Sequence, residues 1–197
     1  SGAIALSAHL AGVIQIMVSA IIQMVLIAEW LFADISRQAS LDPLTGSLNR
    51  RAFATIAGKM LATATRAERP AALLMLDLDH FKRVNDSRGH AFGDSLLCCF
   101  AKVVTDQLRS GDVFCRQGGE EFAILLAETD PARALAVAER LRQSFAAAPC
   151  AVEINATVSI GIACRQSGDS LEDLLRRADQ ALYQAKNDGR NRCVLGN

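Results

Sequence analysis

The sequence has no excess of charge of either sign, since its 197 residues include 21 Lys and Arg against 21 Asp and Glu. A chain without a basic surplus offers no broad electrostatic surface for the phosphates of nucleic acid. We therefore expect no nucleic-acid partner, and any nucleotide chemistry must be local. The length suits one ordinary domain with a short additional segment.

The six cysteines show neither a C-x-x-C pair nor a ligand spacing with the three histidines, which argues against a zinc site. Most of them lie in apolar runs, where a thiol behaves as a small hydrophobe. A disulfide framework also fits poorly at this length. We therefore predict a reduced domain in the cytosol.

Charge is missing altogether from the N-terminal segment, in which no Asp, Glu, Lys or Arg occurs before Glu29. A run of about 20 apolar residues is long enough to span a bilayer, and Trp30 stands where an interfacial aromatic would anchor it. A 3–4 spacing of apolar residues equally fits a coiled-coil seam, but other apolar residues lie off that seam and favour the membrane. We predict a transmembrane or signalling helix in residues 1–40 and an inner-membrane location, with a cytoplasmic location as the alternative.

A turn at Pro43 and Gly46 follows this segment, and we place a domain boundary near residue 40. Through residues 41–197, segments whose apolar residues have the spacing of a helix alternate with segments that have the pattern of a strand, with one hairpin in the middle. This order predicts an α/β (α+β) domain with a mostly antiparallel central sheet, flanking helices and a β-α-β-β-α-β core of the ferredoxin-like or polymerase-palm type. The expected strands are 71–79, 112–116, 121–127, 156–164 and 191–195. One helix is expected to end near residue 66, and three more are expected over 93–110, 130–148 and 171–189. Because the chain begins with Ser1, we expect a piece of a longer protein.

Carboxylates stand at two places where strands end. Asp77 emerges at the end of the apolar strand 71–79, and Glu120 lies in the turn of the hairpin 112–127. If these strands are neighbours, the two carboxylates converge and repel unless a hard divalent cation such as Mg²⁺ neutralises them. Gly118 and Gly119 would let a phosphate approach the backbone N–H groups of the same turn.

Each of these features also has an ordinary structural explanation. A Gly-Gly pair is a good hairpin turn by itself. Asp94 fits a helix N-cap ahead of an apolar run, and Asn85 fits a loop or cap. Lys186 and Arg190 fit basic residues that complement the dipole at a helix C-terminus. Tyr183 has the spacing of a core residue.

Five motifs in order resolve these alternatives through a family resemblance. They are "LDPLTGSLNRR", "DLDHFKRVND", "GHAFGDSLL", "RQGGEEF" and "KNDGRNR". Together they resemble the GGDEF domain of diguanylate cyclases, enzymes that join two GTP molecules into cyclic di-GMP. The resemblance covers about residues 40–195, and the family accepts Glu at the position of Glu120.

The resemblance implies the roles of the catalytic residues. Asp77 and Glu120 would ligate the metal, with the Leu78 carbonyl as a further ligand, and Glu121 would serve at the metal site or accept a proton. Two Mg²⁺ (or Mn²⁺) ions per site would assist attack of one ribose 3′-hydroxyl on the α-phosphate of the other nucleotide. Since each protomer would hold one GTP, catalysis would require a homodimer.

The resemblance also implies two sets of binding residues. Asn85 and Asp94 would read the guanine edge. The remaining substrate-binding residues would be Phe81, Lys82, Gly118, Gly119, Lys186 and Arg190. Arg109 and Asp112 form an R-x-x-D motif that matches the family's product-inhibition site, to which Arg140 would add a contact. The product cyclic di-GMP would thus also be an inhibitor.

Two other function classes remain open at this stage. One is a catalytically silent GGDEF domain that senses GTP or cyclic di-GMP. The other is a structural dimerisation domain. The glycines and the metal carboxylates that silent relatives usually lose are both present here, which favours the enzyme.

Overall fold

The computed structural model describes residues 12, 14–27, 29 and 40–196. The chain divides into two compact units, Ser1–Ser40 and Leu41–Asn197.

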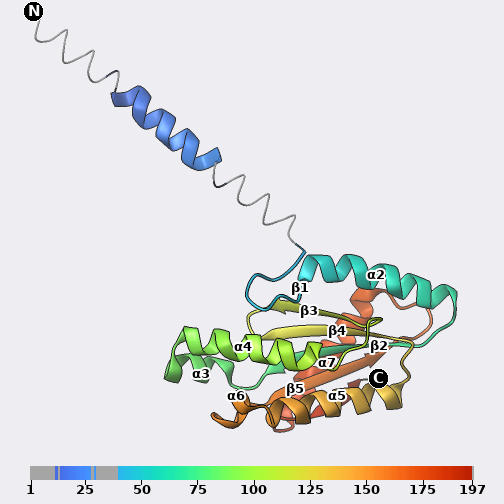
Figure 1. Cartoon of the computed structure of the whole chain (residues 1–197). Coiled ribbons are helices and arrows are strands. Elements are labelled where there is room, and N and C mark those ends of the chain that lie inside the picture. Colours follow the sequence, from blue (N-terminus) through green and yellow to red (C-terminus); the bar gives the residue numbers. More distant parts are fainter. Residues whose placement is uncertain (1–11, 13, 28, 30–39, 197) are drawn as a thin grey trace, which may run out of the picture. The chain divides into compact units, whose positions relative to one another are not determined.

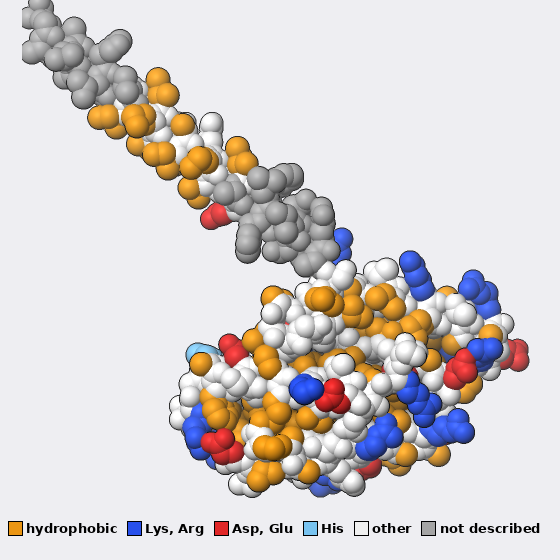
Figure 2. Space-filling model, viewed as in Figure 1, with side chains coloured by type: hydrophobic (Ala, Val, Ile, Leu, Met, Phe, Trp, Pro, Cys, Tyr) orange, Lys and Arg blue, Asp and Glu red, His pale blue; other side chains and the backbone are white. Residues whose placement is uncertain are grey.

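The described residues of the first unit are helical up to residue 29. Large apolar side chains of residues 14–27 are exposed, including Ile16 at 71% and Met24 at 68%, and Figure 2 shows such side chains on one face of this helix. Within the part of the chain that the structure describes, no helix combines the length and the apolar character needed to cross a membrane. The prediction of a membrane helix in residues 1–40 falls partly on residues outside the described ones.

The second unit is built on one six-stranded sheet (Figure 1). Its strands run in the order β1-β3-β4-β2-β5-β6. The pairs β3–β4, β4–β2 and β2–β5 are antiparallel, whereas the edge strands β1 and β6 pair in parallel. The strands are β1 (Leu48–Asn49), β2 (Ala71–Leu78), β3 (Val113–Gly118), β4 (Glu121–Ala127), β5 (Val158–Cys164) and β6 (Cys193–Gly196).

Helices cover both faces of this sheet (Figure 1). They are α2 (Arg50–Arg66), α3 (Phe81–Arg88), α4 (His90–Thr105), α5 (Pro131–Ala146), α6 (Pro149–Val152) and α7 (Leu171–Asn187). The central strand β2 is buried on both sides, and its residues alternate between two cores. Leu74 and Leu76 pack with α4 and α5, whereas Leu73 and Met75 pack with α2 and α7.

Side-chain caps fix where several helices begin. The Asn49 side chain accepts a hydrogen bond from the Ala52 N–H at the start of α2, and the Asp130 side chain accepts one from the Arg133 N–H at the start of α5. Ser170 and Asp173 form a reciprocal capping box on α7. Each such cap stabilises its helix by about 1 kcal/mol.

The predicted fold class is confirmed, including the β-α-β-β-α-β order of β2, α4, β3, β4, α5 and β5. Several details differ from the sequence analysis. The segment after β2 forms the separate helix α3, and α4 therefore begins at His90. Tyr183 is 67% exposed, so its predicted core position is wrong. Cys99 and Cys150 form a disulfide, which the sequence analysis did not expect.

Candidate active site

The first site residue lies at the end of the most buried strand. Asp77 belongs to β2 and faces the same side of the sheet as Leu73 and Met75, toward α7. Its side chain is only 8% exposed, and its Oδ2 lies 2.8 Å from the Nζ of Lys186 near the end of α7. The sheet and α7 together therefore bring two predicted site residues into contact.

The charge on Asp77 is costly in this position. Burial raises the pKa of its carboxyl from 3.8 to about 6, although the Lys186 ammonium works in the opposite direction. The carboxylates of Glu120 and Glu121 add to the rise. Three carboxylates thus act on one another at this end of the sheet, and a cation would relieve the strain.

The β3–β4 hairpin supplies the other two carboxylates. Gly118 pairs with Glu121, and a register shift precedes this pair, so the chain turns at Gly119 and Glu120. Gly118 and Gly119 have φ values of 148° and 53°, which favour glycine. A Cβ atom at either glycine would meet nothing within 4 Å, so the outer side of the turn is open.

The hairpin turn lies beside the end of β2. Asp77 and Glu121 are opposite each other in the β2–β4 register, and the Leu78 N–H donates to the Glu120 carbonyl at 3.4 Å. The structure thus brings Asp77, Glu120 and Glu121 together at the end of the sheet where β2 finishes and β4 begins. Leu78 itself turns its side chain into the opposite core.

An arginine that the sequence analysis missed holds the turn in shape. Arg116 donates to the Gly119 carbonyl from Nε at 2.9 Å and from Nη2 at 2.7 Å. Its Nη1 lies 3.3 Å from Asp42 Oδ1, and both side chains are largely buried. Asp42 also accepts two hydrogen bonds from Thr45. Burial works to raise the pKa of Asp42, but the bonds from Thr45 and the guanidinium of Arg116 lower it overall.

Asp79 directly follows β2, but its carboxylate binds other parts of the protein and has a structural role. It accepts hydrogen bonds from Thr157 Oγ1 at 2.6 Å, Ser159 Oγ at 2.7 Å and the Asn191 N–H at 3.0 Å. These bonds fasten the loop that carries Arg190 to the end of β2. Arg190 has a φ of 64° and its N–H donates to the Ala185 carbonyl.

The helices α3 and α4 position the predicted guanine-reading residues. Asn85 on α3 has a buried Oδ1 that finds no partner among the described residues. This atom lies against Gly93 of α4, where an added Cβ would be only 1.9 Å from it. Asp94 follows in α4 and is exposed; because the N-cap is Gly89, the capping interpretation of Asp94 is wrong. Phe81 is buried at the start of α3.

The predicted product site lies at the opposite end of the hairpin from the Gly-Gly turn. Asp112 accepts from the Arg109 N–H at 3.1 Å and from the Ala127 N–H at 3.2 Å, so it closes the turn before β3. Arg140 of α5 donates to Gln107 Oε1 at 3.1 Å. The structure thus brings Arg140 to the segment that carries Arg109.

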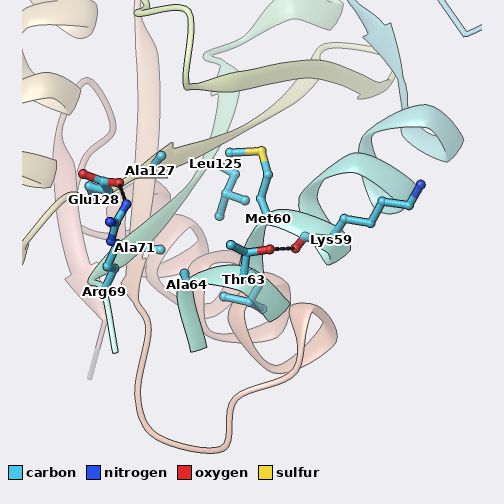
Figure 3. Close-up of a pocket in the computed structure, with 10 residues that line it drawn as sticks. Lys59, Met60, Thr63, Ala64, Arg69, Ala71, Leu125, Ala127 and Glu128 are labelled. Atoms are coloured by element: carbon cyan, nitrogen blue, oxygen red, sulfur yellow. Dashed lines mark hydrogen bonds and ion pairs between the residues drawn. The ribbon is translucent and has the colours of Figure 1, made fainter. Parts of the chain in front are cut away.

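A cavity of about 300 Å³ lies near that same end of β4 (Figure 3). Its walls come from α2 and from the ends of β2 and β4, and Arg69 forms an ion pair with Glu128 beside it. The cavity is distant in the fold from Asp77 and the glycine turn, so it is not part of the candidate active site. The lining residues include Lys59, Met60, Thr63, Arg69, Ala71, Leu125, Ala127 and Glu128.

The residues at the C-terminal end of β2 fit a divalent cation that is also coordinated by a ligand. Among the described residues, no group of three or more His, Cys, Asp or Glu side chains is placed to hold a metal ion. Asp77 and Glu120 therefore offer a pair of carboxylates, and not a complete ligand sphere. Mg²⁺ commonly binds in this way, through one or two carboxylates with substrate phosphates and water completing its coordination.

Comparisons with known proteins agree with this geometry. The family model described as diguanylate cyclase, GGDEF domain, matches residues 39–192. Diguanylate cyclase DgcM of Escherichia coli (strain K12) is 42% identical over 163 residues, which cover 82% of this chain and 39% of that protein. The GGDEF domain of DgcB from Caulobacter crescentus, solved in complex with c-di-GMP, has a TM-score of 0.74 and 32% identity, covering 80% of this chain and 95% of that one. The coiled coil and GGDEF domain of DgcB gives a TM-score of 0.76 at 28% identity and covers 93% of this chain and 99% of that one. The chain thus spans well under half the length of its curated relative.

Proposed function

The chain belongs to the GGDEF family of diguanylate cyclases, and on this premise we propose that residues 41–197 join two GTP molecules into cyclic di-GMP and two pyrophosphates. One observation carries the proposal. The glycine turn, with Glu120, lies beside the buried carboxylate of Asp77 at the C-terminal end of β2. This arrangement supports the proposal, because an open backbone turn that would accept phosphate lies beside two carboxylates that would bind a cation.

The metal would be Mg²⁺ or Mn²⁺, two ions per site, held by Asp77, Glu120 and the Leu78 carbonyl. When bound, such ions supply charge neutralisation at the phosphates and activation of the attacking hydroxyl. The protein's own contribution is to hold the carboxylates in place, through the sheet register and the Arg116 contacts to the turn. Glu121 is close enough to influence Asp77 and is the candidate proton acceptor.

The nucleotide would lie across the loops that surround this pair. Asn85 and Asp94 would accept hydrogen bonds from guanine N1–H and its amine, which adenine does not offer as a donor pair. The buried Oδ1 of Asn85, which has no hydrogen-bond partner within the described part of the chain, supports this role. The triphosphate would meet the backbone of Gly118, Gly119 and Phe81 and the cations of Lys82, Lys186 and Arg190.

Each domain would bind one GTP, so two copies must face each other before a bond can form. We propose that residues 1–40 bring the copies together, either as a coiled coil or in a membrane. The exposed apolar side chains of residues 14–27 support this proposal, because either a second helix or lipid would remove them from water.

We also propose an inner-membrane location with the catalytic domain in the cytoplasm. Mixing the whole chain with liposomes tests this location, and recovery of all protein away from the lipid would contradict it.

Cyclic di-GMP would also bind at Arg109, Asp112 and Arg140 and inhibit the enzyme. The support is that these residues lie together at the far end of the hairpin from the glycine turn. A guanidinium can grip a guanine edge or a phosphate in two places. Arg109→Ala should therefore relieve inhibition by added product without lowering the initial rate.

The decisive experiment is incubation of the protein with GTP and Mg²⁺, followed by quantification of cyclic di-GMP. We expect turnover, and a loss of about 100-fold or more in Glu120→Gln. Glu172→Gln, which removes an exposed carboxylate on α7, is the matched control and should retain activity. Retained but unreacted nucleotide would instead support the silent sensor, and no nucleotide binding would support a structural dimerisation domain.

A further inference from the structure

The disulfide between Cys99 and Cys150 is unexplained by the proposed activity. Cys99 lies on α4 and Cys150 on α6, 51 residues apart in sequence, with a Cα–Cα distance of 6.7 Å. Both residues are partly exposed. The other four cysteines are free thiols.

The setting of this bond makes it reversible. An enzyme that consumes GTP works where nucleoside triphosphates and thiol reductants occur together, and disulfides in such compartments are mostly transient or redox-sensing. Partial exposure allows a thiolate to reach the sulfur atoms. By contrast, Cys115 is buried, and burial raises its pKa to about 12, which leaves it inert.

The bond joins two segments that surround the predicted guanine pocket. Cys99 follows Gly93 and Asp94 on α4, the helix against which Asn85 packs. Cys150 lies on α6, which leads into the segment before β5. In that segment Glu153 pairs with Arg88 of α3, and Thr157 donates to Asp79 just before α3. The disulfide therefore fixes α4 relative to the segment that holds both ends of α3.

We propose that Cys99 and Cys150 form a thiol–disulfide exchange site that adjusts the affinity for GTP. The regulatory part and the expected contact with thiol reductants rest on the proposed function, whereas the pairing of Cys99 with Cys150 does not. In the oxidised form α4 is held against α6 and the pocket is pre-ordered. In the reduced form this link is gone, and GTP must order the pocket on binding.

The chemistry balances with two common classes of reactant. A dithiol reductant attacks one sulfur as a thiolate and forms a mixed disulfide, and its second thiolate then displaces the protein; the products are two protein thiols and an oxidised reductant. In the reverse direction, a peroxide oxidises one cysteine thiolate to a sulfenic acid. The second thiol condenses with it, a sulfur–sulfur bond forms, and water leaves.

The first test is thiol trapping on the whole chain. The protein is treated with hydrogen peroxide, alkylated with or without prior reduction by dithiothreitol, and mapped by mass spectrometry. We expect the Cys99 and Cys150 peptides to be protected unless the protein is reduced. Cys99→Ser should abolish the protection, whereas Cys98→Ser, its neighbour on the same helix, should retain it. Alkylation of Cys99 and Cys150 after peroxide treatment, or a bond that uses Cys98, would overturn the assignment.

The second test measures binding and not turnover. The Kd of a non-hydrolysable GTP analogue is determined by calorimetry for the oxidised and reduced protein, together with the Tm. We expect reduction to weaken binding about fivefold and to lower the Tm by about 5 °C, with Cys99→Ser resembling the reduced protein in both states. Equal Kd values would overturn the regulatory proposal. Absence of cyclic di-GMP synthesis with normal nucleotide binding would instead count against the proposed enzyme only.

Discussion

Asn85 depends on the absence of a side chain on the neighbouring helix. Its Oδ1 occupies the space where a Cβ of Gly93 would be, at 1.9 Å. The glycine therefore has a steric role within an α-helix, where it otherwise costs about 1 kcal/mol relative to alanine. Gly93 therefore lowers the stability of α4 but makes room for Asn85 at the predicted guanine-binding site.

Gly93→Ala should displace Asn85 and raise the KM for GTP by about tenfold or more, since one guanine hydrogen bond of about 1.5 kcal/mol would be lost. The matched control is Gly58→Ala on α2, where an added Cβ would meet nothing within 4 Å. Steady-state kinetics of both variants test the point. An unchanged KM in Gly93→Ala would show that Asn85 does not read the substrate.

Asp77 makes the metal-free protein sensitive to pH. Its pKa is about 6 in the folded protein, against an ordinary value of 3.8. The folded protein therefore binds the proton more tightly than the unfolded chain does, so this stabilisation is complete below about pH 4 and is lost as the pH rises through 6. The loss amounts to about 3 kcal/mol, given 1.36 kcal/mol per pKa unit.

Asp77→Asn should remove this pH dependence while abolishing cyclic di-GMP synthesis. Urea unfolding in metal-free buffer from pH 4 to 8 should show the wild-type free energy of unfolding falling relative to the variant, by up to about 3 kcal/mol. Asp86→Asn, at an exposed position on α3, is the control. Parallel pH curves for wild type and Asp77→Asn would contradict the assigned pKa.

For single residues, the sequence predicted the positions of those side chains whose neighbours follow from the order of the strands. Asp77 and Glu120 could be placed together because one ends a buried strand and the other turns a hairpin. The contact of Arg116 with Asp42 joins residues 74 apart, and no local pattern indicates such a pairing. The exposure of Tyr183 was also not predicted, because helical spacing does not show which face of α7 packs on the sheet.

Among the elements, α7 packs directly on the backbone of β5 at a glycine. Gly161 of β5 lies under α7, where an added Cβ would be 2.1 Å from both the Ala178 carbonyl oxygen and the Leu182 nitrogen. These are backbone atoms, which cannot rotate away as a side chain could. The position of α7 matters for the site because it carries Lys186 to Asp77.

Gly161→Ala should therefore lower the free energy of unfolding by about 3 kcal/mol or more. Chemical denaturation, with Gly58→Ala as the control for the Gly-to-Ala change itself, measures this effect. The variant should also bind GTP less well, because α7 must move. Stability within about 0.5 kcal/mol of wild type would show that α7 does not pack as closely as described.

The existence of the main strands and helices was predictable from their periodicity, but not all of their boundaries were. The polar helix α3 has no long apolar stripe and was overlooked, although Phe81 is buried at its start. The strand β1 has only two residues, too few for any period to appear. The disulfide between Cys99 and Cys150 depends on the packing of α4 against α6, and no local pattern in the sequence reveals that packing.

For the whole molecule, the proposed reaction requires two copies. The specific activity should therefore fall when the protein is diluted below its dimer dissociation constant, whereas a single-chain enzyme would keep it constant. Product formation over a dilution series, measured together with the molar mass by light scattering, tests this expectation. Full specific activity at concentrations where only monomer is present would contradict the requirement for a dimer.

The most direct test of the account is a crystal structure of the protein with Mn²⁺ and a non-hydrolysable GTP analogue. We predict an anomalous Mn²⁺ peak beside the carboxylates of Asp77 and Glu120, which would hold the ion together with the nucleotide, and the triphosphate on the turn of Gly118 and Gly119. A metal or nucleotide bound elsewhere, with these two carboxylates uninvolved, would contradict the central claim.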